Sequence, residues 1–166
     1  NPAERTRALQ LPARVTKRTR ALAQQWRNSA MQHTRNESDR TMAIVQNALE
    51  YFHNEPFYYT LQPPALGVNP IDQFLFVTRA GFCEHYASSF ALLMRLAGVP
   101  ARIVLGYLGA EYNPIGGHYL VRQSDAHAWA EIWLAQRGWV RIDPTAAIAP
   151  ERINVDASFA QLGTDT

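Results

Sequence analysis

The sequence predicts a single α+β domain spanning all 166 residues, in which helices precede an antiparallel sheet. Apolar residues first recur at the three- and four-residue steps of helices. After Pro100 the period changes to two, and the turns between apolar runs are short enough for antiparallel hairpins. Hydrophobic residues make up 47% and charged residues 18%, which excludes a disordered chain. No apolar run approaches the ~20 residues that a membrane-spanning helix needs.

The N-terminal part, residues 1–55, is expected to form two helices. Pro12 suits the first turn of a helix that runs to about Met31. Ser38 is a suitable N-cap for a second helix, which ends before Pro56. The side chains expected to be buried in these helices are Val15, Leu22, Trp26, Met42, Val45, Leu49 and Phe52.

Residues 56–150 are expected to form the catalytic core, and residues 151–166 a C-terminal tail. The strongest helical pattern begins at Cys83 and is stopped by Gly98 and Pro100. Its expected buried positions are Ala87, Phe90, Ala91, Met94 and Ala97. The expected strands are Phe57–Leu61, Arg102–Leu108, His118–Arg122, Ala126–Leu134 and Trp139–Ile142, and Asp72–Val77 is expected to be a short helix.

Positive charge is concentrated at the N-terminal end of the chain. Residues 1–40 hold nine Lys and Arg side chains and three acids, whereas the remaining 126 residues hold seven basic and eleven acidic groups. A basic segment can bind nucleic acid or an anionic surface. However, Trp26 is the only aromatic residue among the first forty, so no stacking side chains interleave with the charges. We therefore expect a solvated helix face and no nucleic-acid partner.

The chain contains one cysteine, which excludes an internal disulfide framework, an iron–sulfur cluster and a multi-cysteine zinc site. Cys83 falls where a helix begins, and free N–H groups with a partial positive charge favour the thiolate there. The alternative is a buried cysteine that packs as a small hydrophobic residue. His85 lies about 200° around the helix from Cys83 and points elsewhere.

A cysteine nucleophile needs a base and a group that orients the base. His127 lies in an expected strand whose alternation places it on one face with Trp129. Asp143 follows the partner strand of the expected hairpin. A symmetric register sets Asp143 opposite Ala130, three residues or ~10 Å short of His127. Contact between the two groups therefore requires a bulge or an asymmetric loop.

Four sequence blocks resemble the transglutaminase-like superfamily, in that family's order and spacing. They are Gly81–Ser88, Leu96–Arg102, Asp125–Glu131 and Gly138–Thr145. Phe74–Arg79 resembles the bacterial, membrane-anchored branch. The resemblance implies a papain-like cysteine fold in which a central helix bears Cys83 as nucleophile. It also implies His127 as base and Asp143 as orienting acid. No metal or cofactor is expected.

The same resemblance implies an acyltransferase that forms a Cys83 thioester from a glutamine amide and passes the acyl group to an amine or to water. The expected partners are a protein or peptide with a glutamine side chain, an amine acceptor and the rest of a membrane-anchored parent chain. Because the sequence starts at Asn1 rather than Met, we expect a segment of a longer protein. The resemblance implies a periplasmic domain of a bacterial inner-membrane protein.

The tetrahedral intermediate of such a reaction requires hydrogen-bond donors for its oxyanion. The backbone N–H of Cys83 is expected to be one donor, since it lies at the helix start. Tyr58 or Tyr59 is the candidate for the second donor, and Trp129 the candidate for a wall of the acyl channel. For all three aromatic side chains, packing within the fold is the alternative.

Three rival functions remain compatible with parts of the pattern. A cysteine peptidase or amidase acting on cell-envelope peptides would use the same three residues, and the sequence does not separate it from transamidation. A non-catalytic binding module is disfavoured by the complete Cys–His–Asp set. Metal binding by Cys83, His85 and His127 is disfavoured because their spacing matches no established zinc motif.

Overall fold

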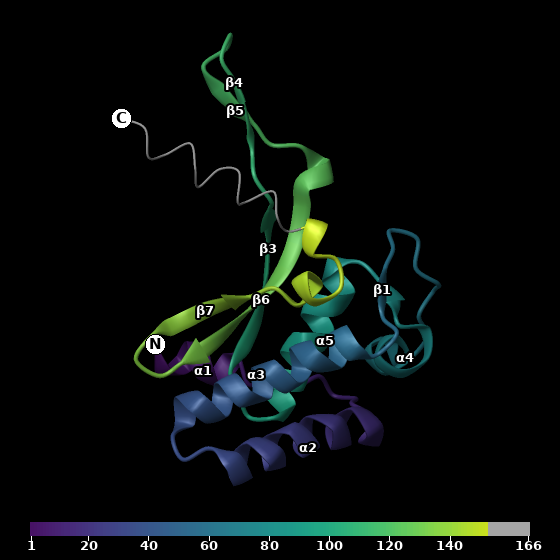
Figure 1. The fold of residues 1–166 in the computed structure, drawn as a ribbon, viewed down its shortest axis with the longest axis vertical. Coiled ribbons are helices and arrows are strands. Elements are labelled where there is room, and N and C mark those ends of the chain that lie inside the picture. Colours follow the sequence, from purple (N-terminus) through teal and green to yellow (C-terminus); the bar gives the residue numbers. More distant parts are fainter. Residues whose placement is uncertain (153–166) are drawn as a thin grey trace.

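The computed structural model describes residues 1–152 and confirms the expected α+β class, with a central helix packed on an antiparallel sheet (Figure 1). The helices are α1 (Pro2–Arg7), α2 (Lys17–His33), α3 (Glu37–Asn54), α4 (Pro70–Gln73) and α5 (Cys83–Leu96). The strands are β1 (Tyr58–Tyr59), β2 (Ala80–Gly81), β3 (Ala101–Tyr107), β4 (Glu111–Asn113), β5 (His118–Leu120), β6 (Ala126–Leu134) and β7 (Gly138–Ile142). The expected tail, 151–166, lies outside the described residues from 153 onward.

The first long helix starts later than the sequence predicts. Helix α2 begins at Lys17, where the Thr16 hydroxyl accepts a hydrogen bond from the Thr19 N–H at 3.1 Å. The expected start at Pro12 is therefore wrong, because a side-chain cap four residues later satisfies the free N–H groups of the first turn. Of the three expected core residues, Trp26 is buried, whereas Val15 and Leu22 are only half-buried.

Helix α3 begins at Glu37, and its N-cap is Asn36 rather than the expected Ser38. The Asn36 side-chain oxygen accepts the Asp39 N–H at 2.7 Å. Met42, expected in the core, is 42% exposed. The buried stripe of α3 consists of Ile44, Val45, Ala48 and Phe52, so the expected positions at Val45 and Phe52 are confirmed, and Leu49 is half-buried.

Helix α5 is the central element, because it contacts β3 and β6 of the sheet as well as α2 and α3. All five of its expected buried positions, from Ala87 to Ala97, are buried. An aromatic cluster joins α5 to the segment before it, with the rings of Phe57, Phe74 and Tyr86 at centroid separations of 5.0–6.1 Å. The Tyr86 hydroxyl also donates to the Tyr58 carbonyl at 2.9 Å. These contacts hold the chain that leads into Cys83.

The main sheet has the strand order β3-β6-β7, and both pairings are antiparallel. The expected strand Ala126–Leu134 matches β6 in both bounds. Its partner pairs with Leu134 opposite Gly138 and Ala130 opposite Ile142. The expected register, with Asp143 opposite Ala130, is therefore wrong by one residue. The reason is the three-residue turn at 135–137, where Gln136 has a positive φ angle of 69°, followed by Gly138 at the start of β7 with a φ angle of 79°.

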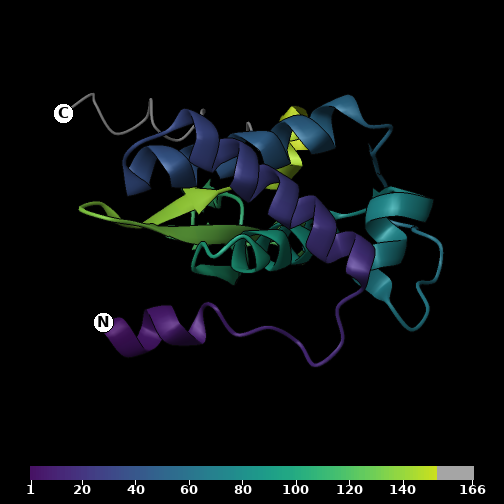
Figure 2. The same ribbon diagram turned by 90° about the horizontal axis from the view of Figure 1, so that it is seen from below.

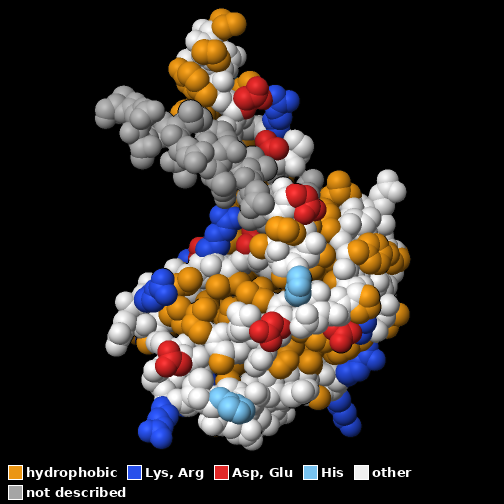
Figure 3. Space-filling view, in the orientation of Figure 1, with side chains coloured by type: hydrophobic (Ala, Val, Ile, Leu, Met, Phe, Trp, Pro, Cys, Tyr) orange, Lys and Arg blue, Asp and Glu red, His pale blue; other side chains and the backbone are white. Residues whose placement is uncertain are grey.

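Two segments extend from this core. Strands β4 and β5 form an arm that projects beyond the sheet, and Figure 3 shows apolar side chains at its end. The second is the N-terminal segment, in which α1 and the residues after it run along the side of the molecule away from α3 (Figure 2). The Ala101 N–H donates to the Ala8 carbonyl at 3.0 Å, so this segment lies against the edge of β3. Among residues 1–152, no helix combines the length and hydropathy required to cross a membrane.

Replacing Asn36 with Ala is expected to destabilise the protein by about 1 kcal/mol, because the Asp39 N–H loses its side-chain acceptor. Ser38→Ala is the matched control and is expected to change the free energy of unfolding by only a few tenths of that amount. Urea unfolding followed by circular dichroism measures both. A larger loss for Ser38→Ala than for Asn36→Ala would contradict the assignment of the cap.

Candidate active site

Cys83 is the first residue of α5, and the backbone of Phe82 before it is extended. The short parallel pairing of β1 with β2 sets Tyr59 opposite Gly81, two residues before the cysteine. Cys83 is 9% exposed and packs against Ala87 of its own helix and Ala128 of β6. The start of the helix is thereby pressed against the middle strand of the sheet, with the sulfur at their junction.

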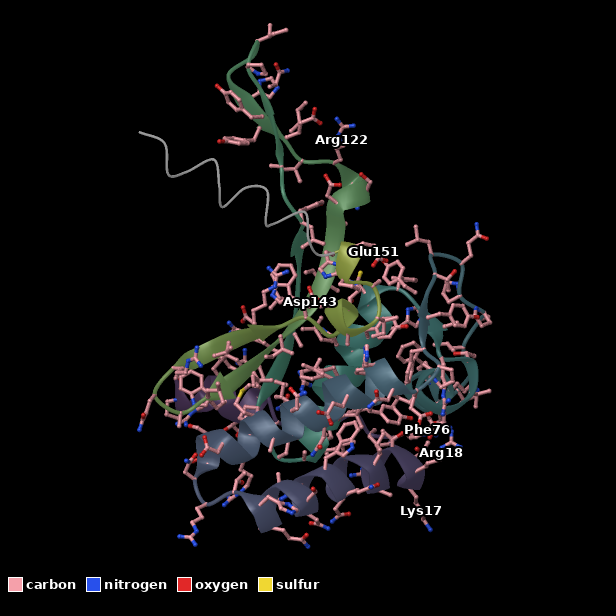
Figure 4. The ribbon with its side chains drawn as sticks, viewed as in Figure 1. Lys17, Arg18, Phe76, Arg122, Asp143 and Glu151 are labelled. Atoms are coloured by element: carbon pink, nitrogen blue, oxygen red, sulfur yellow. The ribbon has the colours of Figure 1, made fainter. Side chains whose placement is uncertain are left out.

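His127 is 6% exposed, and its Nε2 lies 2.8 Å from Oδ2 of Asp143. Figure 4 shows Asp143 at the end of β7, where that strand meets β6. The other carboxylate oxygen of Asp143 accepts the Thr145 N–H at 3.2 Å, which fixes the plane of the carboxylate. Since Nε2 is engaged by Asp143, Nδ1 is the ring nitrogen left to face Cys83. The structure thus brings Cys83, His127 and Asp143 together.

The electrostatics favour an ion pair between Cys83 and His127. Burial raises the pKa of the Cys83 thiol, but hydrogen bonds from His127 and from the backbone of Ala128 and Glu84 outweigh it, so the net pKa is lowered. Burial lowers the pKa of His127, but its hydrogen bonds with Asp143 and Cys83 raise it to about 9. Both shifts favour the thiolate–imidazolium pair, which is the reactive form of a cysteine nucleophile.

A cleft with a volume of about 610 Å³ opens above the sulfur. Its walls come from four parts of the chain: the β1 region, the start of α5, the end of β3 and the start of β6. The lining residues are Tyr59, Leu61, Phe82, Cys83, Glu84, Leu105, Gly106, Tyr107, Gln123, Ser124, Ala126, His127 and Ala128. A cleft of this size, apolar with a few polar groups, is typical of a binding site.

The three aromatic residues singled out in the sequence occupy different places. Tyr59 lines the cleft. Tyr58 is 54% exposed and is not among the lining residues, although its carbonyl accepts the Tyr86 hydroxyl. Trp129 does not line the cleft either. Its indole stacks beneath the His127 ring at a centroid separation of 6.3 Å and an interplanar angle of 21°.

Arg141 and Gly106, which were not singled out in the sequence, lie against the residues that contact His127. The Arg141 guanidinium lies 4.4 Å from the centre of the Trp129 ring and 3.3 Å from Oδ2 of Asp143. A Cβ atom at Gly106 would come within 2.6 Å of the Trp129 ring, so only glycine leaves room for that indole. Two features of the sequence could have indicated these residues. The first is Gly106 itself, because a glycine inside a strand often marks a close approach of another group. The i and i+2 spacing of Arg141 and Asp143 also places both on one face of a strand.

His85 lies away from the cleft, as its helical position predicts. Its ring contacts Phe74 and Phe82 at centroid separations of 5.5 and 4.5 Å, and its Nδ1 accepts the Phe82 N–H at 3.4 Å. Burial lowers its pKa. Within residues 1–152, no group of three or more His, Cys, Asp or Glu side chains is arranged to hold a metal ion.

Comparison with known proteins identifies the class to which this site belongs. The family model of the transglutaminase-like superfamily matches residues 20–144, and the chain is a member of that family. This confirms the resemblance carried by the four sequence blocks.

Individual relatives show which members of the family the chain resembles. The chain is 49% identical over 163 residues to a Pseudomonas aeruginosa protein named protein-glutamine gamma-glutamyltransferase, covering 98% of this chain and 23% of that protein. It is 34% identical over 146 residues to YebA of Bacillus subtilis, an uncharacterized protein, covering 84% of this chain and 19% of YebA.

Solved structures agree with these relatives. The periplasmic domain of TgpA from Pseudomonas aeruginosa, bound to ethylmercury, matches with a TM-score of 0.81 at 49% identity over 92% of this chain. A second structure of that domain matches with a TM-score of 0.81 at 46% identity. The chain spans 52% of each solved domain and less than a quarter of the curated relatives.

The interaction of His127 with Cys83 predicts the pH dependence of alkylation. In the unaltered protein the imidazolium persists up to about pH 9 and stabilises the thiolate, so iodoacetamide reacts rapidly at neutral pH. His127→Gln removes the positive charge, which raises the pKa of Cys83. The alkylation rate is then expected to fall about tenfold for each pH unit by which the pKa of Cys83 comes to exceed the pH of the assay.

His85→Gln is the matched control for this measurement, since it removes a nearby imidazole that does not line the cleft. Its alkylation profile is expected to follow that of the unaltered protein. The interpretation fails if His127→Gln leaves the profile in place, or if His85→Gln shifts it equally.

Proposed function

We propose that this domain catalyses transglutaminase-type acyl transfer, with Cys83 as nucleophile, His127 as general acid and base, and Asp143 as the group that orients the imidazole. One observation carries the proposal. Cys83 at the start of α5 and His127 line the same cleft, and Nε2 of His127 lies 2.8 Å from the half-buried carboxylate of Asp143.

In the first half-reaction, the Cys83 thiolate attacks the carboxamide carbon of a glutamine side chain. The backbone N–H groups at the start of α5 stabilise the oxyanion, helped by the partial positive charge of the helix end. His127 gives its proton to the departing nitrogen, the C–N bond breaks, and ammonia leaves. The product is a thioester on Cys83, and His127 is then neutral.

In the second half-reaction, an amine attacks the thioester carbon, and His127 accepts a proton from it. The new C–N bond forms, the C–S bond breaks, and the thiolate–imidazolium pair is restored. Asp143 holds His127 in the tautomer that these transfers require and stabilises the imidazolium. Water in place of the amine gives deamidation, so the balance of products depends on which nucleophile reaches the thioester.

The substrate class and location follow from the relatives. The name protein-glutamine gamma-glutamyltransferase supports a glutamine side chain on a protein or peptide as acyl donor. The solved periplasmic domain of TgpA supports a periplasmic location for this chain. The small share of the curated relatives that it covers supports its place within a larger parent protein, for which we propose a membrane anchor.

The central test is incorporation of a fluorescent alkylamine into a glutamine-containing peptide, followed by mass spectrometry of the peptide. The unaltered domain is expected to form the amide, and Cys83→Ala is expected to abolish it because no thioester can form. Circular dichroism of Cys83→Ala controls for folding. Amine incorporation by Cys83→Ala would overturn the role of Cys83. Cleavage of the peptide backbone without incorporation would favour the peptidase alternative.

Self-crosslinking provides a separate test, because the chain has ten glutamines but a single lysine, Lys17. Lys17 is exposed at the start of α2, and Figure 4 shows it projecting from the end of the molecule opposite the β4–β5 arm. The domain incubated alone is expected to form few covalent oligomers, and Lys17→Arg fewer still. Denaturing gel electrophoresis measures both. Extensive oligomers of Lys17→Arg would contradict transamidation to lysine.

A further inference from the structure

The charges that line the cleft are uneven. Glu84 is its only carboxylate, and neither lysine nor arginine is among its lining residues. The only cationic group there is His127, which is paired with Cys83 and Asp143. The remaining lining side chains are aromatic, aliphatic, amide or hydroxyl groups. An approaching molecule therefore meets one uncompensated charge at the cleft wall, and that charge is negative.

Glu84 is well placed to act on whatever approaches the sulfur. It is exposed and follows Cys83 directly in the first turn of α5. Within residues 1–152 its carboxylate makes no ion pair and accepts no side-chain hydrogen bond. The carboxylate acts electrostatically on the neighbouring His85. The carboxylate is therefore available to a ligand.

Within residues 1–152, two further acids on the segments that follow β3 and precede β6 are engaged. Asp125, next to the lining residue Ser124, accepts the Ser124 hydroxyl at 3.2 Å and the Arg122 N–H at 3.3 Å. Glu111 on the arm is paired with the Arg122 guanidinium. Glu84 therefore differs from both, because it lines the cleft and its carboxylate is free to bind a cation beside the nucleophile.

We infer that Glu84 selects the acyl acceptor by binding an alkylammonium group, such as a lysine side chain, next to the Cys83 thioester. The inference rests on the proposed acyl transfer and specifies its second half. The ammonium binds at Glu84 and loses one proton to neutral His127, and the resulting amine attacks the thioester carbon. The C–S bond breaks and the second nitrogen proton passes to water. Ammonia released in the first half takes up an equivalent proton from water.

The test compares a charged acyl acceptor with an uncharged one, both of which attack the thioester through a nitrogen atom. A lysine-type alkylamine is cationic at neutral pH, whereas hydroxylamine is largely uncharged. In Glu84→Gln, the ratio of kcat/KM for the alkylamine to that for hydroxylamine is expected to fall about two- to fivefold, the range that an exposed ion pair supplies. The change is expected in KM for the alkylamine, and the ratio in the unaltered protein is expected to decline with added salt.

Glu37→Gln is the matched control, since Glu37 is also an exposed glutamate in the first turn of a long helix but does not line the cleft. Its acceptor ratio is expected to match that of the unaltered protein, and Glu84→Asp is expected to retain part of the preference. An equal fall with both acceptors in Glu84→Gln, or an unchanged ratio, would overturn the role of Glu84. Failure of the unaltered protein to use either acceptor would instead overturn the proposed function itself.

Discussion

The arrangement around the sulfur depends on how closely α5 packs against β6. The facing sides of these elements carry small side chains, with Ala87 and Ala91 on the helix and Ala128 and Ala130 on the strand, each at most 2% exposed. Larger residues at these positions would hold the helix farther from the sheet. The close approach places the first residue of α5, Cys83, beside the backbone N–H of Ala128 and the side chain of His127. The small residues that pack the interior therefore also determine where the sulfur lies relative to His127.

The second constraint is the register between β6 and β7. A one-residue slip moves every side chain of a strand to the opposite face of the sheet. With Ala130 opposite Ile142, the next residue, Asp143, comes level with Trp129 and on the same face as His127. Asp143 and His127 are then diagonal neighbours on adjacent strands. Their side chains span the distance between them, which gives the 2.8 Å contact without a bulge. The turn that sets this register therefore also sets the orientation of the imidazole.

That outer face of the sheet is covered by alternating aromatic and charged side chains. They are Trp129, Glu131 and Trp133 of β6, Trp139 and Arg141 of β7, and Arg102 of β3. Guanidinium groups lie over the indoles, with Arg102 4.2 Å from the centre of Trp139. Arg102 also pairs with Glu131 and with Glu4 of α1, so the N-terminal segment is tied to the same face. Part of the basic character of residues 1–40 is therefore used within the fold, since Arg5 lies over Trp133.

The sequence by itself determined the class of fold, the bounds of β6, the buried face of α5 and the three residues gathered at the site, because these follow from local periodicity and from the four family blocks. Helix starts at Pro12 and Ser38 were wrong, since several polar residues in succession can cap a helix and tertiary contacts select among them. Only the tertiary structure decided three features. They are the register that brings Asp143 to His127, the stacking of Arg141 on Trp129 and of Trp129 on His127, and the exposure of Glu84 in the cleft. Each of these features depends on contacts between separate elements, and no local sequence pattern specifies how close those elements come in the folded chain.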